Sequence, residues 1–140
     1  MRSLAFLLFA SPAAAWDASR EGAVCLLTHE MKGAEVIVSH DATKDVPYAI
    51  DLRLEEGWQA GPIFSIRFDG PVQRTITTDR HKVTDNTLTV TDSGFGNVLD
   101  GIALNRVAIA VTGETALAIP LVGAAPEVEA FKACAANLAV

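Results

Sequence analysis

Ser39, His40 and Asp41 follow one another in the sequence and supply the three residue types of a hydrolase triad. A triad requires a histidine that hydrogen-bonds both the nucleophile and the acid. Successive side chains of an extended segment point to opposite faces, so His40 would point away from both of its neighbours. This spacing favours the polar end of a strand over a catalytic triad.

The chain contains three histidines, His29, His40 and His81, and each has a carboxylate residue close by in the sequence. Histidines that bind metals commonly occur in pairs at short fixed spacing, and no such pair is present. We therefore predict exposed histidines at strand ends, with no metal site, no catalytic residue and no cofactor. A small metal-dependent or hydrolytic periplasmic enzyme that uses His29, His40 or His81 is the alternative hypothesis.

Two further segments could recognise a ligand. The segment 79–82, Asp-Arg-His-Lys, is typical of a solvated turn, and its cations could contact an anion. The segment 94–96, Gly-Phe-Gly, lacks the third glycine and the strand-helix-strand setting of a dinucleotide-binding turn. We expect a loop whose Phe95 packs against the helix that follows. Candidate residues for surface recognition are therefore Arg80, His81 and Phe95.

The first fifteen residues resemble a secretory signal in composition. They contain Arg2, a short apolar run, and small residues at 13 and 15, just before Trp16. This pattern predicts cleavage before Trp16, export to the periplasm or the extracellular space, and a single domain over 16–140. The apolar run is shorter than the ~20 residues of a membrane-spanning helix, so no transmembrane segment is expected.

Cys25 and Cys134 are the two cysteines of the chain. In an oxidising compartment an isolated pair of this kind favours a disulfide over two free thiols. The bond would close nearly the whole domain and would clamp a C-terminal helix onto the strand that contains Cys25.

The charge of the chain bears on its partners. The formal net charge is −6, and removal of residues 1–15 takes away Arg2 and leaves −7. An acidic chain without a basic patch repels phosphate backbones, so nucleic-acid binding is not expected. We predict an exported envelope protein that acts as a non-catalytic binding module, with an envelope protein or a small ligand as its partner.

The hydrophobic pattern predicts short strands. Period-two alternation is clearest over 48–55 and recurs over 63–68. Hairpins are expected where two β-prone runs flank a turn. The expected hairpins are 23–38 with Gly33, the Thr-rich stretch 74–91 with its turn at 85–86, and 107–121 with its turn at 113–115. A C-terminal helix is expected to begin near Pro126. Helical spacing over 97–104 indicates a candidate short internal helix. Seven or eight strands of this kind predict a mainly β fold, an antiparallel sandwich or partly closed barrel with one C-terminal helix.

The C-terminal third resembles a known family. It contains Gly-Glu-Thr at 113–115, Ile-Pro-Leu-Val-Gly at 119–123, and Phe-Lys-Ala-Cys at 131–134. This part is similar to small exported bacterial proteins of the invasion-associated locus B type. The resemblance implies an exported envelope protein and assigns no catalytic residue.

A second resemblance covers most of residues 16–140. It depends on Arg-Phe-Asp-Gly at 67–70, Thr-Asp-Arg-His at 78–81 and Gly-Phe-Gly-Asn-Val-Leu at 94–99. These motifs resemble short exported chains that are often labelled as the helicase-type component of excinuclease ABC. Such a repair protein needs a phosphate-binding loop that ends in Gly-Lys-Ser/Thr, and no Gly-Lys dipeptide occurs here. The label therefore does not fit the chemistry of the residues.

Overall fold

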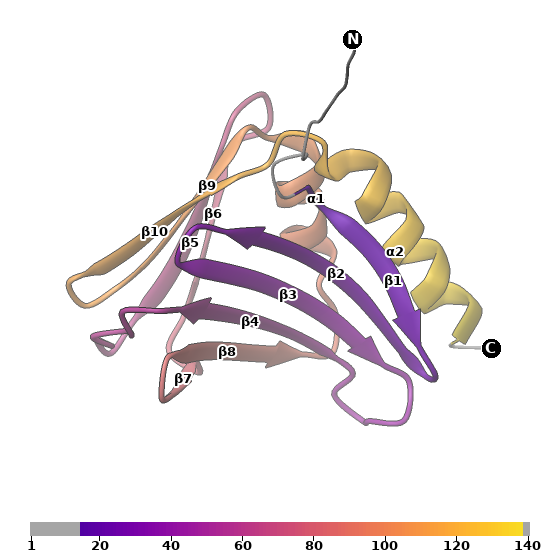
Figure 1. The fold of residues 1–140 in the computed structure, drawn as a ribbon, viewed down its shortest axis with the longest axis horizontal. Coiled ribbons are helices and arrows are strands. Elements are labelled where there is room, and N and C mark those ends of the chain that lie inside the picture. The colour runs from indigo at the N-terminus through magenta and orange to yellow at the C-terminus, as the bar shows by residue number, and fades with distance from the viewer. Residues whose placement is uncertain (1–14, 139–140) are drawn as a thin grey trace, which may run out of the picture.

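A computed structural model of the chain describes residues 15–138 as two antiparallel sheets and two helices (Figure 1). Sheet A has six strands in the order β1-β2-β3-β4-β8-β7, and sheet B has four in the order β10-β9-β5-β6. The strands of sheet A are β1 (Asp17–Glu21), β2 (Val24–Met31), β3 (Ala34–Asp41), β4 (Tyr48–Leu54), β7 (Lys82–Thr84) and β8 (Thr87–Asp92). Those of sheet B are β5 (Phe64–Asp69), β6 (Arg74–Thr78), β9 (Val107–Thr112) and β10 (Thr115–Pro120). Within the described residues the two sheets do not close into a barrel.

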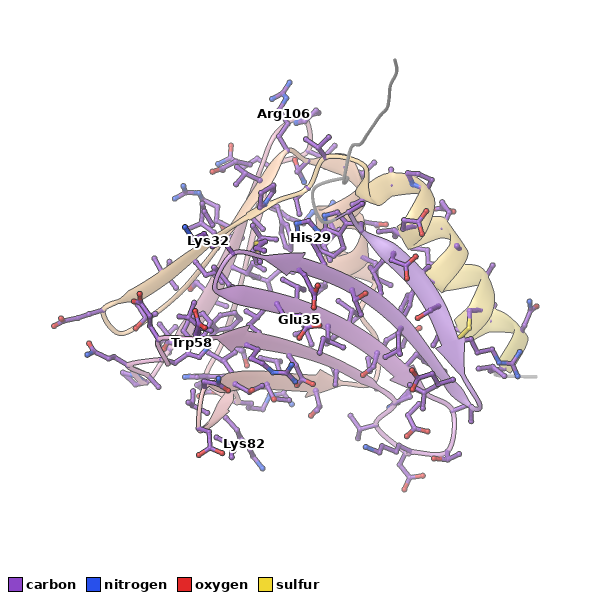
Figure 2. All side chains as sticks on the ribbon, in the orientation of Figure 1. His29, Lys32, Glu35, Trp58, Lys82 and Arg106 are labelled. Carbon is purple, nitrogen blue, oxygen red and sulfur yellow. A yellow bond between two sulfur atoms is a disulfide. The ribbon has the colours of Figure 1, made fainter. Side chains whose placement is uncertain are left out.

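The inner faces of both sheets form the core. In sheet A, Leu27, Val38 and Ile50 are paired across three adjacent strands, and all three are buried. In sheet B, Phe64 and Phe68 are buried at alternate positions of β5. The alternation of apolar and polar residues thus places one face of each strand in the core and the other in solvent. Glu35 lies on the outer face of sheet A, where it forms an ion pair with Arg53 (Figure 2).

Two helices occupy one end of the molecule. Helix α1 (Gly96–Leu104) connects the two sheets, and α2 (Ala124–Leu138) packs against α1, β1 and β2. Val128 and Phe131 are fully buried on the inner face of α2. Neither helix, within the described part of the chain, has the length and hydropathy of a membrane-spanning helix.

The Cys25–Cys134 disulfide joins β2 to α2 across 109 residues of sequence, and its sulfur atoms form the yellow bond in Figure 2. The predicted pairing is confirmed. The side chain of Cys25 is fully buried because it lies on the inner face of β2, toward the helix.

The two tryptophans connect parts of the fold that are distant in sequence. Trp16 precedes β1 in sheet A, and its Nε1 donates a hydrogen bond of 3.0 Å to the carbonyl of Pro120 in sheet B. Trp58 lies in the crossing from β4 to β5, and its Nε1 donates to the carbonyl of Leu52 at 2.9 Å. Both rings are buried, as expected for large aromatic groups with a satisfied polar atom.

The predicted fold class is confirmed as mainly β with two antiparallel sheets, a C-terminal helix and a short internal helix. The predicted number of strands is too low, because the described residues form ten. The strand β1 has no apolar alternation in its sequence and is held by β2 and α2. The stretch 74–84 divides into β6 and β7, which belong to different sheets.

Candidate functional site

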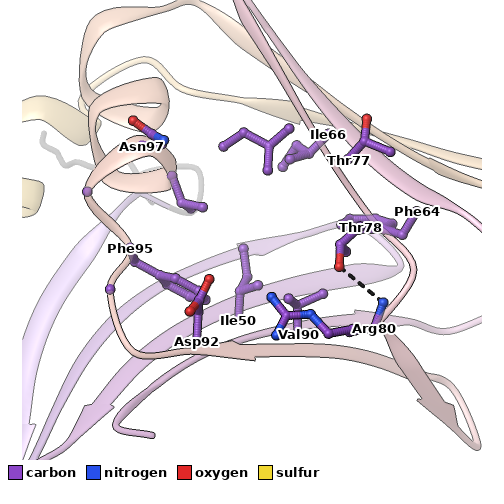
Figure 3. Close-up of a pocket in the computed structure, with 14 residues that line it drawn as sticks. Ile50, Phe64, Ile66, Thr77, Thr78, Arg80, Val90, Asp92, Phe95 and Asn97 are labelled. Carbon is purple, nitrogen blue, oxygen red and sulfur yellow. Dashed lines mark hydrogen bonds between the residues drawn. The ribbon is translucent and has the colours of Figure 1, made fainter.

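A cavity of about 360 Å³ lies between the inner faces of the two sheets (Figure 3). Sheet A contributes β4 and β8, sheet B contributes β5 and β6, and the start of α1 closes one end. The connection from β6 to β7 lies at the other end. The lining residues are Ile50, Phe64, Ile66, Ile76, Thr77, Thr78, Arg80, Val90, Asp92, Gly94, Phe95, Gly96, Asn97 and Val98.

The walls of the cavity are apolar. Ile66 and Ile76 are directly paired between β5 and β6, and both point toward sheet A. Ile50 and Val90 are paired between β4 and β8 on the opposite wall. Ile76 and Val90 are only half-buried, whereas Ile50 and Ile66 are buried. The cavity therefore extends from half-buried aliphatic side chains near the surface to buried ones in the core.

Polar groups surround the opening of the cavity. Arg80 and Asn97 are exposed, and Asp92 is half-exposed. In Figure 3 the Arg80 side chain extends along the cavity on the side where Asp92 lies. The backbone N–H of Arg80 donates to the hydroxyl of Thr78 at 3.0 Å, which fixes the main chain just after β6. Within residues 15–138 the guanidinium group itself forms no hydrogen bond and no ion pair.

The first turn of α1 also faces the cavity. Phe95 is the N-cap residue of this helix and offers no side-chain acceptor to the free backbone N–H groups. Asn97 accepts a hydrogen bond of 3.3 Å from Arg74, so its side chain is held against β6. The helix contains no acidic residue in its first turn, and its N-terminal partial positive charge is not neutralised by its own side chains.

Phe95 was expected on the surface, and the structure corrects this position. Its ring is 4% exposed and stacks on Tyr48, with ring centroids 5.4 Å apart. Phe95 contributes to the wall of the cavity because the loop before α1 folds inward over β4. Phe95 was expected to pack against the helix that follows, whereas its stacking partner Tyr48 belongs to sheet A.

Arg80 and His81 were expected to share an exposed turn. Arg80 is exposed, whereas His81 is half-buried beside Phe64, with ring centroids 6.0 Å apart. The Nε2 atom of His81 lies 2.9 Å from the carbonyl oxygen of Gly61 and 3.5 Å from the hydroxyl of Thr112. His81 thus joins the β6–β7 connection to sheet B, while Arg80 points to the cavity.

His29 and His40 were expected at exposed strand ends, and this expectation is wrong. Both lie on the inner face of sheet A, where His29 is 7% and His40 is 5% exposed. His29 stacks on Trp16, with ring centroids 4.8 Å apart, and neither ring nitrogen has a hydrogen-bond partner among the described residues. Burial lowers the pKa of His29. The ring of His40 packs edge-on against the ring of Tyr48, with ring centroids 4.7 Å apart.

The Ser39-His40-Asp41 sequence does not form a triad. His40 points into the core, while Ser39 and Asp41 lie on the outer face of β3. Asp41 Oδ1 accepts hydrogen bonds from the hydroxyl and the backbone N–H of Thr43, and these bonds lower the pKa of Asp41. The expected alternation along this strand is confirmed.

The structure does not bring the three histidines together. His29 pairs with Val36 and lies four positions along the sheet from His40, a separation of about 13 Å at the usual strand rise. His81 lies beside sheet B. Residues 15–138 contain no group of three or more histidine, cysteine, aspartate or glutamate side chains that could hold a metal ion.

Sequence reasoning identified Arg80 and Phe95 but missed the aliphatic wall of the cavity. Ile76 and Val90 follow the ordinary alternation of a half-buried strand, and no motif distinguishes them from core residues. The cavity exists because the two sheets are not packed side chain to side chain along this part of their interface. That property depends on the arrangement of the sheets and leaves no local signal.

Comparisons of the chain with protein-family models, with curated proteins and with solved structures gave no match. The two resemblances proposed from the sequence therefore remain predictions.

Proposed function

We propose that this protein is an exported binding module that holds a small, largely apolar molecule in the cavity between its sheets. The observation that carries this proposal is the cavity itself, whose volume of about 360 Å³ lies at the lower end of the range of about 300–1,000 Å³ typical of small-molecule sites. Its composition also fits such sites, which combine apolar walls with a few polar groups at defined positions.

Binding without catalysis is the role that this lining supports best. The titratable side chains among the lining residues are Arg80 and Asp92, and Asp92 accepts a hydrogen bond of 2.7 Å from the backbone N–H of Ser93. General acid–base catalysis uses a group with a perturbed pKa held by a second side chain next to the substrate. The cavity instead offers an aliphatic and aromatic surface, which contributes affinity through the removal of apolar area from water.

Export is the second part of the proposal. The composition of residues 1–15 supports it, and the Cys25–Cys134 disulfide is compatible with an oxidising compartment. Intact-mass measurement on material from the envelope and the medium tests the proposed cleavage before Trp16. A mass that still includes Met1 would contradict it.

The cavity is tested with N-phenyl-1-naphthylamine, a neutral apolar probe whose fluorescence rises on transfer from water. Wild-type protein should bind the probe saturably at one site. The substitution Ile76→Trp places a large ring in the cavity from the edge strand β6 and should weaken binding by about tenfold or more, since it fills the space that the probe would occupy.

Ile109→Trp is the matched control. Ile109 is half-buried in the same sheet but alternates with the buried residues Ala108 and Ala110, so its side chain lies on the outer face. This variant should bind the probe like the wild type. Equal binding by wild type and Ile76→Trp, with melting temperatures unchanged, would overturn the proposed site.

A further inference from the structure

The cavity has an asymmetric distribution of charge at its opening. Arg80 is the one lysine or arginine among the lining residues, and its guanidinium group has no partner within the described residues. Two exposed arginines on outer sheet faces, Arg53 and Arg67, are instead paired with carboxylates, Arg53 with Glu35 at 2.6 Å and Arg67 with Asp69 at 2.9 Å. Arg80 is therefore a cation beside an apolar cavity, and no carboxylate among residues 15–138 forms an ion pair with it.

The opposite end of the opening adds backbone donors. The first turn of α1, from Gly96 to Val98, lines the cavity, and its N–H groups receive no acceptor from the N-cap residue Phe95. The amide of Asn97 lies at the same end. Uncapped N–H groups at a helix N-terminus favour an anion, and they act here in addition to Arg80.

Asp92 is the one carboxylate among the lining residues. It accepts hydrogen bonds from the backbone N–H and the hydroxyl of Ser93, at 2.7 and 3.4 Å, through the same oxygen. The Asp92 carboxylate therefore has one oxygen engaged by its own loop. It opposes an anion at the opening but does not form an ion pair with Arg80.

We propose that the cavity binds an anionic amphiphile, a monocarboxylate with an apolar tail. The carboxylate contacts Arg80 at the opening, and the tail lies between Ile76 and Val90. An arginine guanidinium matches a carboxylate in charge and in its two-oxygen geometry. This inference rests on the proposed function, because it names the class of ligand for the same cavity.

A cationic amphiphile fits the cavity less well. Its head group would meet the guanidinium of Arg80 and the positive end of α1, with Asp92 alone to attract it. A neutral amphiphile would use the apolar walls but would leave the donors of Arg80 unused. The order of affinity expected from the charges is carboxylate, then neutral, then cation.

Isothermal titration calorimetry with decanoate, decanol and decylamine at pH 8 tests this order. The three probes share one tail and differ in their head groups. Decanoate should bind wild-type protein about fivefold more tightly than decanol, a modest factor because Arg80 is exposed to solvent. Decylamine should bind more weakly than decanol.

Two variants assign the preference to the opening of the cavity. Arg80→Met removes the charge and retains the length of the side chain, and it should remove most of the preference for decanoate over decanol, with the remainder due to the backbone donors of α1. Asp92→Asn removes the opposing carboxylate and should tighten decanoate binding by about twofold to threefold.

Arg106→Met is the control for net charge, because Arg106 is exposed just before β9 and does not line the cavity. This variant should retain the preference for decanoate. Equal affinities of wild-type protein for decanoate and decanol, or equal loss of preference in Arg80→Met and Arg106→Met, would overturn the inference and leave the proposed cavity site intact. Failure of all three probes to bind would overturn the proposed function itself.

Discussion

Gly101 of α1 faces the ring of Phe68 so closely that a Cβ atom at this position would lie 2.5 Å from Phe68 Cδ2. Phe68 is fully buried in β5, so core atoms enclose its ring. The glycine is therefore the residue that allows helix α1 to lie directly on sheet B, next to the cavity.

Gly101→Ala should destabilise the protein although alanine is the better helix former. The gain in helix propensity is about 1 kcal/mol, whereas overpacking of a filled core costs about 1–3 kcal/mol, so we expect a net loss of up to about 2 kcal/mol. Chemical denaturation measures the free energy of unfolding. Gly96→Ala is the control, since a Cβ atom there would meet nothing within 4 Å. A stabilised Gly101→Ala variant would show that the contact with Phe68 relaxes freely.

Replacement of Cys25 and Cys134 together by alanine should lower the free energy of unfolding by about 4 kcal/mol. The disulfide closes a loop of 109 residues, and loss of this cross-link increases the entropy of the unfolded chain. The measurement is the denaturation midpoint with and without a reductant. The wild type should respond to the reductant and the double variant should not. A midpoint of the double variant equal to that of the oxidised wild type would contradict this prediction.

The sequence allowed most of the strands and both helices to be predicted because their signals are local. Period-two alternation identified β4, turn residues identified the hairpins, and the lone cysteine pair identified the contact between β2 and α2. The strand β1 was missed because its sequence is mostly polar, and its position depends on contacts formed by the rest of the fold. One of these contacts is the hydrogen bond of 2.9 Å from the backbone N–H of Ala18 to Glu127.

The candidate site was less predictable than the fold. Arg80 and Phe95 stood out as a charged turn residue and an aromatic residue between glycines. The histidines were misplaced, because a polar residue type was assumed to lie in solvent. His29 is instead buried against Trp16, whose aromatic ring covers it. The space between the sheets depends on their relative position, which alternation along single strands does not encode.

His29 predicts a dependence of stability on pH. Its pKa in the folded protein lies below the ordinary value of 6.5, because burial disfavours the charged ring. The unfolded chain binds the proton of His29 more strongly than the folded protein does. The folded state therefore loses stability through His29 as the pH falls through and below 6.5, and it suffers no such loss well above that value. We expect the free energy of unfolding to decrease between about pH 7.5 and about pH 5.5.

His29→Phe should weaken this dependence, since phenylalanine retains an aromatic ring against Trp16 and carries no titratable group. The comparison is the difference in unfolding free energy between the variant and the wild type at each pH, which cancels the contributions that the two proteins share. The unfolding free energy of the variant should rise relative to that of the wild type as the pH falls. A difference that stays constant over this range would show that His29 does not contribute to the pH dependence.

Thr112 holds the segment that precedes β5 against sheet B. Its hydroxyl accepts a hydrogen bond of 2.9 Å from the backbone N–H of Gly61 and donates one of 2.8 Å to the carbonyl of Ile63, and the residue is 1% exposed. Thr112→Val preserves the shape of the side chain and leaves both backbone groups without this partner. A buried polar group without a partner costs about 1–3 kcal/mol, so we expect a loss of about 2 kcal/mol in unfolding free energy.

Thr115→Val provides the comparison that separates burial from hydrogen bonding. The Thr115 hydroxyl also accepts a backbone hydrogen bond of 2.9 Å, from the N–H of Gln59, but this contact is exposed to solvent. Water replaces the lost acceptor there, so Thr115→Val should lower the unfolding free energy by less than about 0.5 kcal/mol. Denaturation curves of the two variants and the wild type give both values. Equal losses in the two variants would mean that water reaches Gly61 as readily as Gln59, and that the Thr112 hydroxyl is not needed to hold this segment.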